Sequence, residues 1–106
     1  MSDSVPPAAD CFVRLGVELI AHRWDAVVLT ALRDGALRRV DLRAGIGGIS
    51  DKALHESLLR LRDFRLVAKE DEGHRYRLTD VGTSFATGPV LALAQWAEAN
   101  HSSLAS

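Results

Sequence analysis

The spacing of the apolar residues changes once along the chain, near Phe64, and this change restricts the possible folds more than any other feature. The leucines before it lie four and three residues apart, as on one face of an α-helix; they are Leu54, Leu58 and Leu61. After it, residues 66–71 and 74–78 alternate in the manner of β-strands, and Gly73 favours a tight reversal between them. The sequence therefore predicts a helix capped by Ser50 and followed by a two-stranded hairpin.

Other start and stop signals predict further helices and one very short strand. Asp10 and Asp25 are suited to begin helices. Thr79 opens a last helical region that Gly82 and then Gly88-Pro89 should interrupt. The other predicted helices cover residues 10–21, 25–34, 40–44 and 89–101, and the short strand covers residues 37–39.

Length and composition indicate one small globular unit. The chain has 106 residues, of which 47% are hydrophobic and 25% are charged. We expect a flexible tail, residues 1–9, and one domain, residues 10–106. No apolar run is long enough to span a membrane, and the N-terminus lacks the features of a signal peptide, so we expect a cytoplasmic protein without a membrane partner. Cys11 is the single cysteine, which excludes an internal disulfide, and no cysteine and histidine residues have the spacing of a metal site.

The net charge of −1 hides an uneven distribution. Residues 33–77 carry eleven lysines and arginines against eight acidic residues, whereas the segments on both sides are net acidic. A basic centre between acidic ends suits the binding of a polyanion. The sequence contains no nucleophile elbow, phosphate loop, two-histidine metal motif or paired-carboxylate pattern, so we expect neither an enzyme nor a bound cofactor.

Five segments together resemble the HxlR-type branch of the MarR-like transcription regulators. They are Cys11 at the head of the first predicted helix, HRWDAVVLTAL (22–32), GISDKALHESLLRL (48–61), LVAKE (66–70) and YRLTDVG (76–82), and the resemblance extends over residues 11–100. The order of the predicted elements is also that of this family. We therefore expect a mainly α (α+β) fold, a winged helix-turn-helix with a two-stranded wing and terminal dimerisation helices.

The resemblance implies a homodimer that binds double-stranded DNA at an inverted-repeat operator. The fourth helix would enter the major groove, the wing would touch neighbouring phosphates, and the first and last helices would form the dimer interface. The residues that we expect to contact DNA are Arg38, Arg39, Arg43, Ser50, Lys52, His55, Arg60 and Arg75. The expected interface residues are Val13, Val17, Ile20, Val90, Leu93, Trp96 and Ala97.

Three features depart from the family pattern. Leu59 stands where such proteins commonly have an arginine, Glu56 places a negative charge on the outward face of the fourth helix, and the short wing is acidic at residues 70–72. Each carboxylate near a phosphate costs about 1 kcal/mol. The alternative function is therefore a winged-helix scaffold with little DNA affinity that binds a small molecule or a protein, with ordinary solvated charges on its fourth helix.

Two regulatory sites are also predicted. Some relatives sense oxidants or electrophiles through a cysteine at the position of Cys11, where the helix dipole would favour a thiolate; alternatively, Cys11 is a small residue at the subunit interface. His22, Trp24 and Trp96 are candidates for a pocket that binds a small aromatic or apolar effector, as regulators of the wider MarR class do. The alternative is that the tryptophans only anchor the core.

Overall fold

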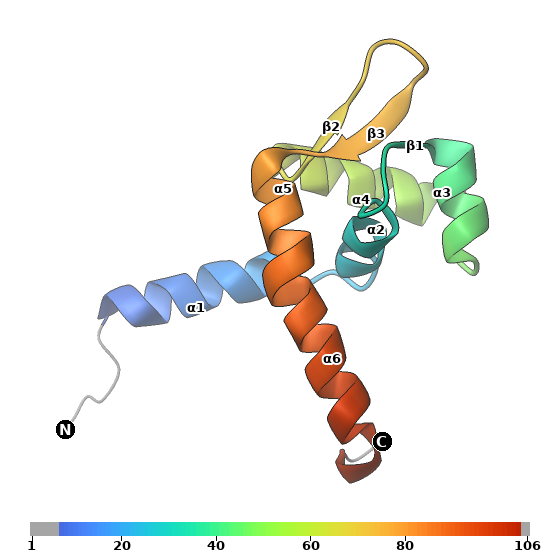
Figure 1. The fold of residues 1–106 in the computed structure, drawn as a ribbon. Helices are drawn as coiled ribbons and strands as arrows, with labels where there is room; N and C mark the ends of the chain where they lie inside the picture. Colours follow the sequence, from blue (N-terminus) through green and yellow to red (C-terminus); the bar gives the residue numbers. More distant parts are fainter. Residues whose placement is uncertain (1–6, 105–106) are drawn as a thin grey trace, which may run out of the picture.

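A computed structural model describes residues 7–104 of the chain. The elements in chain order are α1 (Pro7–Leu19), α2 (Asp25–Ala31), β1 (Leu37–Arg38), α3 (Arg39–Ile46), α4 (Asp51–Asp63), β2 (Val67–Lys69), β3 (Arg75–Leu78), α5 (Asp80–Phe85), the π-helical segment η1 (Ala86–Val90), α6 (Leu91–Asn100) and the 3-10 turn η2 (His101–Ser103). The hairpin β2–β3 stands far from the end of α6, and α1 projects to one side (Figure 1). This order confirms the predicted winged helix-turn-helix.

The hydrophobic core lies where α2, α4 and η1 meet. The leucine stripe of α4 points into it, as predicted, because its three leucines are almost fully buried. The other buried apolar residues are Val28, Leu29, Leu32, Leu42, Ile49, Leu66, Val67, Tyr76, Ala86 and Val90. Burial of one such side chain contributes about 1.5–3 kcal/mol, so this cluster holds the helices that carry the candidate site in place.

The first helix begins earlier than the sequence suggested. It starts at Pro7 rather than at Asp10 and ends at Leu19 rather than at residue 21. Proline suits the first helical position because its φ is already helical and its missing N–H would have no partner within the helix. The expected extended tail is therefore wrong for residues 7–9, and residues 1–6 lie outside the described part. Cys11 consequently lies in the second turn of α1.

The wing is shorter than predicted and belongs to a three-stranded antiparallel sheet with the order β1-β3-β2. Its strands give way to a turn in which Gly73 and His74 have positive φ values of 75° and 52°. The N–H of Glu70 donates to the carbonyl of Arg75 at 2.7 Å and closes this turn. The third helix is longer than predicted, since it covers Arg39–Ile46 instead of residues 40–44.

The C-terminal region is one continuous helical rod, which contradicts the predicted interruptions at Gly82 and Gly88-Pro89. The chain stays helical from α5 through η1 into α6. Pro89 lies inside the π-helical turn of η1, where the wider backbone ring accommodates a residue without an N–H. The proline therefore changes the local helix type and does not end the helix.

Gly82 lies where the start of α5 packs closely against the backbone of Leu66. A Cβ atom at this position would lie 1.9 Å from the carbonyl oxygen of Leu66. Thr79 sits at the same junction, where its Oγ1 accepts a hydrogen bond from the Gly82 N–H at 3.0 Å and donates one to the Arg65 carbonyl at 2.7 Å. The start of α5 is thus attached directly to the segment that follows α4.

The two terminal helices leave apolar side chains exposed. On α1, Phe12 is 72% exposed, and on α6, Trp96 is 56% exposed. Their exposed apolar neighbours on the same helices are Val13, Leu15, Val17 and Leu93. Such a contiguous apolar surface on a small protein is typical of an interaction site. Within residues 7–104, no helix is both long and apolar enough to cross a membrane.

Candidate nucleic-acid interface

The candidate site begins at the N-terminus of α4. Ser50 is extended, with φ −75° and ψ 157°, and its Oγ accepts a hydrogen bond from the Ala53 N–H at 3.0 Å, so the predicted cap is confirmed. Lys52 and His55, in the first two turns, are exposed. A helix N-terminus combines unpaired backbone N–H groups with the positive end of the helix dipole, which favours a phosphate. This end of α4 is therefore suited to an anionic ligand.

Arg38 and Arg75 form a pair of like charges where β1 meets the first residue of β3, next to the turn of the wing. They are directly opposite each other in the β1–β3 ladder, next to the pair Leu37 and Tyr76. Tyr76 is buried, so alternation along the strands turns both arginines outward, and both are exposed. Among the described residues, neither arginine forms an ion pair with a carboxylate. Two positive side chains directly opposite each other on neighbouring strands repel, and an anion bound between them would remove this electrostatic repulsion.

A salt bridge joins the start of α3 to the start of α4. Arg39 Nη2 lies 2.6 Å from Asp51 Oδ2, and Arg39 Nε donates to Asp51 Oδ1 at 3.2 Å. Nearby, Arg43 Nε donates to the Ile49 carbonyl at 3.4 Å while its side chain stays exposed. The bridge brings the β1–α3 junction, with Arg38, beside the first turn of α4. It also occupies Arg39, whose charge is offset by Asp51.

Arg60, one of the residues expected to contact DNA, does not point outward with the rest of the outer face of α4. Its side chain is only 30% exposed and turns toward α2, where Nη2 donates to Asp25 Oδ1 at 2.9 Å and Nε to Asp25 Oδ2 at 3.1 Å. The hydrogen bonds that Arg60 donates to Asp25 raise the pKa of the Arg60 guanidinium above its usual value. Asp25 is fully buried and also accepts a hydrogen bond from Ser57 Oγ at 2.7 Å. Sequence reasoning missed both Asp25 and Ser57 as partners.

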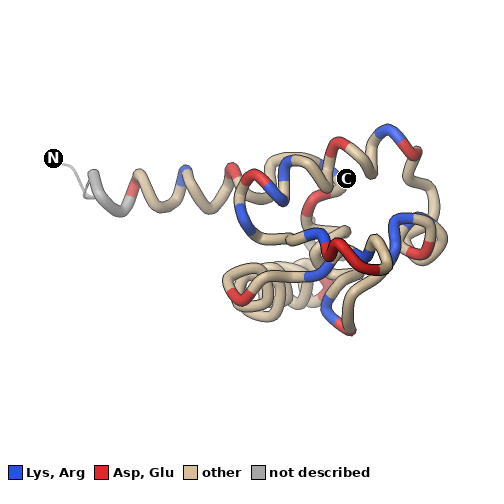
Figure 2. The backbone as a smooth tube through the Cα atoms, turned by 90° about the horizontal axis from the view of Figure 1, so that it is seen from above, with Lys and Arg blue, Asp and Glu red and all other residues tan. Residues whose placement is uncertain are grey.

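The tip of the wing is acidic and exposed. Asp71 and Glu72 lie on the turn, and Glu70 is 3.8 Å from Arg77 Nε, close enough for a weak ion pair. Lys69 lies over the ring of Tyr76, 5.6 Å from its centre. Basic and acidic residues are interspersed along the chain (Figure 2). Among the described cations of the wing, Arg77 therefore has a carboxylate partner, whereas Lys69 and Arg75 have none.

Comparison with known proteins places the chain in a family of regulators. The model of the HxlR-like helix-turn-helix family matches residues 19–104. The HTH-type transcriptional regulator YtfH of Escherichia coli K12, itself uncharacterized, is 37% identical over 98 residues, covering 88% of this chain and 77% of that protein. The chain belongs to the HxlR-like helix-turn-helix family.

Solved structures agree with this assignment. Quinone-bound YodB from B. subtilis has a TM-score of 0.74 and 26% identity, and the similarity covers 83% of this chain and 97% of YodB. A chain described as a MarR-family regulator from Enterococcus faecalis V583 has a TM-score of 0.78 with 20% identity, over 96% of each chain, and shows the shared fold.

The outer face of α4 carries side chains of mixed character. Leu59 is 46% exposed, and Glu56 is exposed beside it. No salt bridge joins Glu56 to Lys52 among the described residues. The outer face of α4 thus combines one lysine, one histidine, one carboxylate and one leucine.

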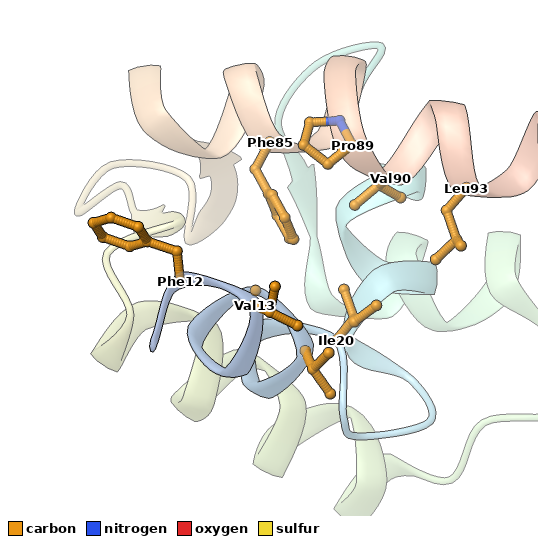
Figure 3. Close-up of a pocket in the computed structure, with 9 residues that line it drawn as sticks. Phe12, Val13, Ile20, Phe85, Pro89, Val90 and Leu93 are labelled. Atoms are coloured by element: carbon orange, nitrogen blue, oxygen red, sulfur yellow. The ribbon is translucent and has the colours of Figure 1, made fainter. Parts of the chain in front are cut away.

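The three residues predicted for an effector pocket do not line the apolar cleft of the structure. His22 is exposed, Trp24 is half-buried against the core with Arg23 4.8 Å from the centre of its ring, and Trp96 is exposed on α6. An apolar cleft of about 360 Å³ lies instead between α1 and the rod formed by α5, η1 and α6 (Figure 3). Its lining residues are Phe12, Val13, Gly16, Val17, Ile20, Phe85, Pro89, Val90 and Leu93.

Five of the seven predicted interface residues line this cleft, namely Val13, Val17, Ile20, Val90 and Leu93. Val90 is almost fully buried within the protomer, so it forms the floor of the cleft and has little surface left for a partner. Phe12, Phe85 and Pro89 were missed, although Phe12 follows the same helical spacing as the predicted residues of α1. Ala97 and Trp96 lie farther along α6.

Cys11 is exposed on α1, next to Phe12. Because α1 begins at Pro7, the thiol is not in the first turn, and the predicted advantage from the helix dipole is reduced. Arg14, the nearest cation in sequence, is 3.0 Å from Asp10 and is paired there. The structure thus supports reactivity of the Cys11 thiol through its exposure to solvent and not through a neighbouring cation.

Proposed function

We propose that the protein is a homodimeric, cytoplasmic transcription regulator that binds double-stranded DNA at an inverted repeat, with half-sites about one DNA turn apart. The observation that carries this proposal is the arrangement of the described residues where β1 meets the start of β3. Arg38 and Arg75 form an outward pair without a carboxylate, beside the capped N-terminus of α4. Phosphates of one DNA strand would relieve the repulsion between the arginines while α4 enters the major groove.

The contacts divide into two groups. Arg38, Arg43 and Arg75 are proposed to bind phosphates, and Lys52 and His55, on the exposed start of α4, to reach base edges or the adjacent phosphate. Ser50 supports the same helix end through its cap. Arg39 contributes less, because Asp51 already holds its guanidinium.

Lys52→Gln is expected to weaken operator binding and to lower the salt dependence of binding. A phosphate contact releases about one counterion, so the slope of log K against log salt should fall by about 1. The measurement is a titration of a promoter fragment at several salt concentrations.

Lys69→Gln is the matched control, since Lys69 is the other lysine of the chain and lies against Tyr76 in the wing. It should leave the slope unchanged. Weak, sequence-indifferent binding by the wild-type protein at low salt would instead favour the scaffold function, in which the apolar cleft binds a small molecule or a protein.

We further propose that oxidants or electrophiles act on Cys11. The supporting observations are the exposure of the thiol beside the cleft and the likeness to YodB, whose structure was solved with a bound quinone. Since the chain has one cysteine, a disulfide can form only with another chain or a small thiol. Treatment with a quinone or a mild oxidant should release DNA from the wild type and not from Cys11→Ser, as measured by the fraction of promoter fragment bound; equal release from both would remove Cys11 from the mechanism.

A further inference from the structure

Three hydrogen bonds converge on the buried carboxylate of Asp25, all of them from α4. Ser57 Oγ donates at 2.7 Å, Arg60 Nη2 at 2.9 Å and Arg60 Nε at 3.1 Å. Asp25 is the first residue of α2 and has no exposed surface. This cluster, the Asp25–Ser57–Arg60 link, is the only direct polar side-chain contact between α2 and α4 among the hydrogen bonds of residues 7–104.

The Asp25–Ser57–Arg60 link restricts the rotation of α4 about its own axis, which apolar packing alone does not. Leucines of α4 bury area against α2, but the hydrophobic effect has no direction and tolerates small rotations of a helix about its axis. A guanidinium that donates two hydrogen bonds to one carboxylate fixes both distance and angle. A buried carboxylate without these donors would be costly, so the arrangement is strongly preferred. Asp25 therefore fixes the rotation of α4.

Rotation of α4 determines which side chains face the DNA. On a helix each residue turns by about 100°, so Lys52, Glu56 and Leu59 lie on the side opposite the leucine stripe, whereas Arg60 lies on the flank that faces Asp25. A modest rotation would change which base edges Lys52 can reach, while its charge stays near the phosphates, and would bring Arg60 toward the groove. The position of α4 relative to the α1–α2 turn, and so to the terminal helices, depends on the same contact.

We propose that Arg60 is a positioning residue, which holds α4 at the rotation needed to read the operator and does not itself contact DNA. This inference rests on the proposed DNA-binding function. It assigns a role in recognition to Asp25 and Ser57, which lie inside the protein. It also removes Arg60 from the residues expected to contact DNA.

The experiment compares Asp25→Asn, Arg60→Gln and Arg60→Lys, with Lys52→Gln as the control for a direct contact. Each variant is titrated with its operator fragment and with an unrelated DNA fragment over a range of salt, and its thermal midpoint is recorded. We expect Asp25→Asn to weaken operator binding on the order of tenfold while binding to unrelated DNA is not weakened. The opposite sign, tighter operator binding, would show that the released Arg60 charge contacts DNA and would overturn the proposal.

The arginine variants give a second, independent readout. Arg60→Gln should leave the salt slope unchanged, whereas Lys52→Gln should reduce it by about 1. Arg60→Lys keeps the charge but loses the two-pronged geometry, so it should lose operator affinity as Arg60→Gln does. Wild-type operator affinity in Arg60→Lys, or a slope lowered by about 1 in Arg60→Gln, contradicts positioning.

If Asp25→Asn or Arg60→Gln does not fold, the operator affinity of Arg60→Lys still tests the positioning role. This variant retains a cation next to the buried Asp25 carboxylate and is therefore the least disruptive of the three. If the wild-type protein shows no preference for its own promoter region, the DNA-binding function itself fails, and this result is distinct from a failure of the positioning role.

Discussion

Val13→Asp is expected to convert the protein to a monomer and to lower its affinity for a two-half-site operator by about 100-fold or more. Val13 is exposed on α1 and lines the cleft that α1 forms with the C-terminal rod. A carboxylate there would have to be desolvated in any interface that covers the cleft, and an unpaired buried charge is strongly unfavourable. The loss of affinity follows because two linked half-sites bind with an avidity that one protomer lacks.

The measurement combines light scattering, for the mass in solution, with titration of the operator. Val81→Asp is the control, since Val81 is also an exposed valine but lies on α5 and does not line the cleft. It should remain dimeric and retain operator affinity. A Val13→Asp protein that stays dimeric would mean that the interface lies elsewhere, and the exposed faces of α1 and α6 would need another partner.

Gly82→Ala is expected to cause a larger loss of stability than the same change at any other described glycine. The added Cβ would lie 1.9 Å from the Leu66 carbonyl oxygen, a backbone atom that cannot rotate away. To make room, the start of α5 would have to move from Leu66 and Arg65 and break the hydrogen bonds of Thr79. The free energy of unfolding should fall by about 3 kcal/mol or more.

Thermal unfolding checks this expectation, with a midpoint more than about 10 °C lower than that of the wild type. Gly45→Ala is the matched control. Gly45 is helical in α3, a Cβ there meets nothing within 4 Å, and alanine is the better helix former, so stability should rise slightly. A Gly82→Ala protein as stable as the wild type would show that the junction between Leu66 and α5 is not close-packed.

The sequence predicted those parts of the fold in which each residue depends mainly on its neighbours along the chain. Leu54, Leu58 and Leu61 share one helix face by spacing alone, Ser50 caps the helix locally, and Gly73 supplies a turn. These local rules agree with the tertiary structure, so the helix-turn-helix and the wing were predicted correctly.

The errors arose where the role of a residue depends on a segment distant in sequence. Arg60 and Asp25 are 35 residues apart, and no periodicity connects them. From the sequence, Gly82 was expected to interrupt the helix, but its lack of a Cβ atom allows the backbone of Leu66 to approach α5. Pro89 was also expected to interrupt the helix, but a π-helical turn accommodates it. The apolar cleft was missed for the same reason, since α1 and the C-terminal rod that line it are far apart in sequence.

Thr79 links α4 to the terminal rod, and this link affects the geometry of the proposed dimer. One hydroxyl group connects the end of the α4 segment, through the Arg65 carbonyl, to the first turn of the rod that leads into α6. Gly82, which has no Cβ atom, lies beside this hydrogen-bonded joint and allows the start of α5 to approach Leu66 closely. The joint therefore connects α4 and the terminal rod as one unit. In the proposed symmetric dimer, this joint would set the distance between the two α4 helices and thereby the spacing of the half-sites that the protein tolerates.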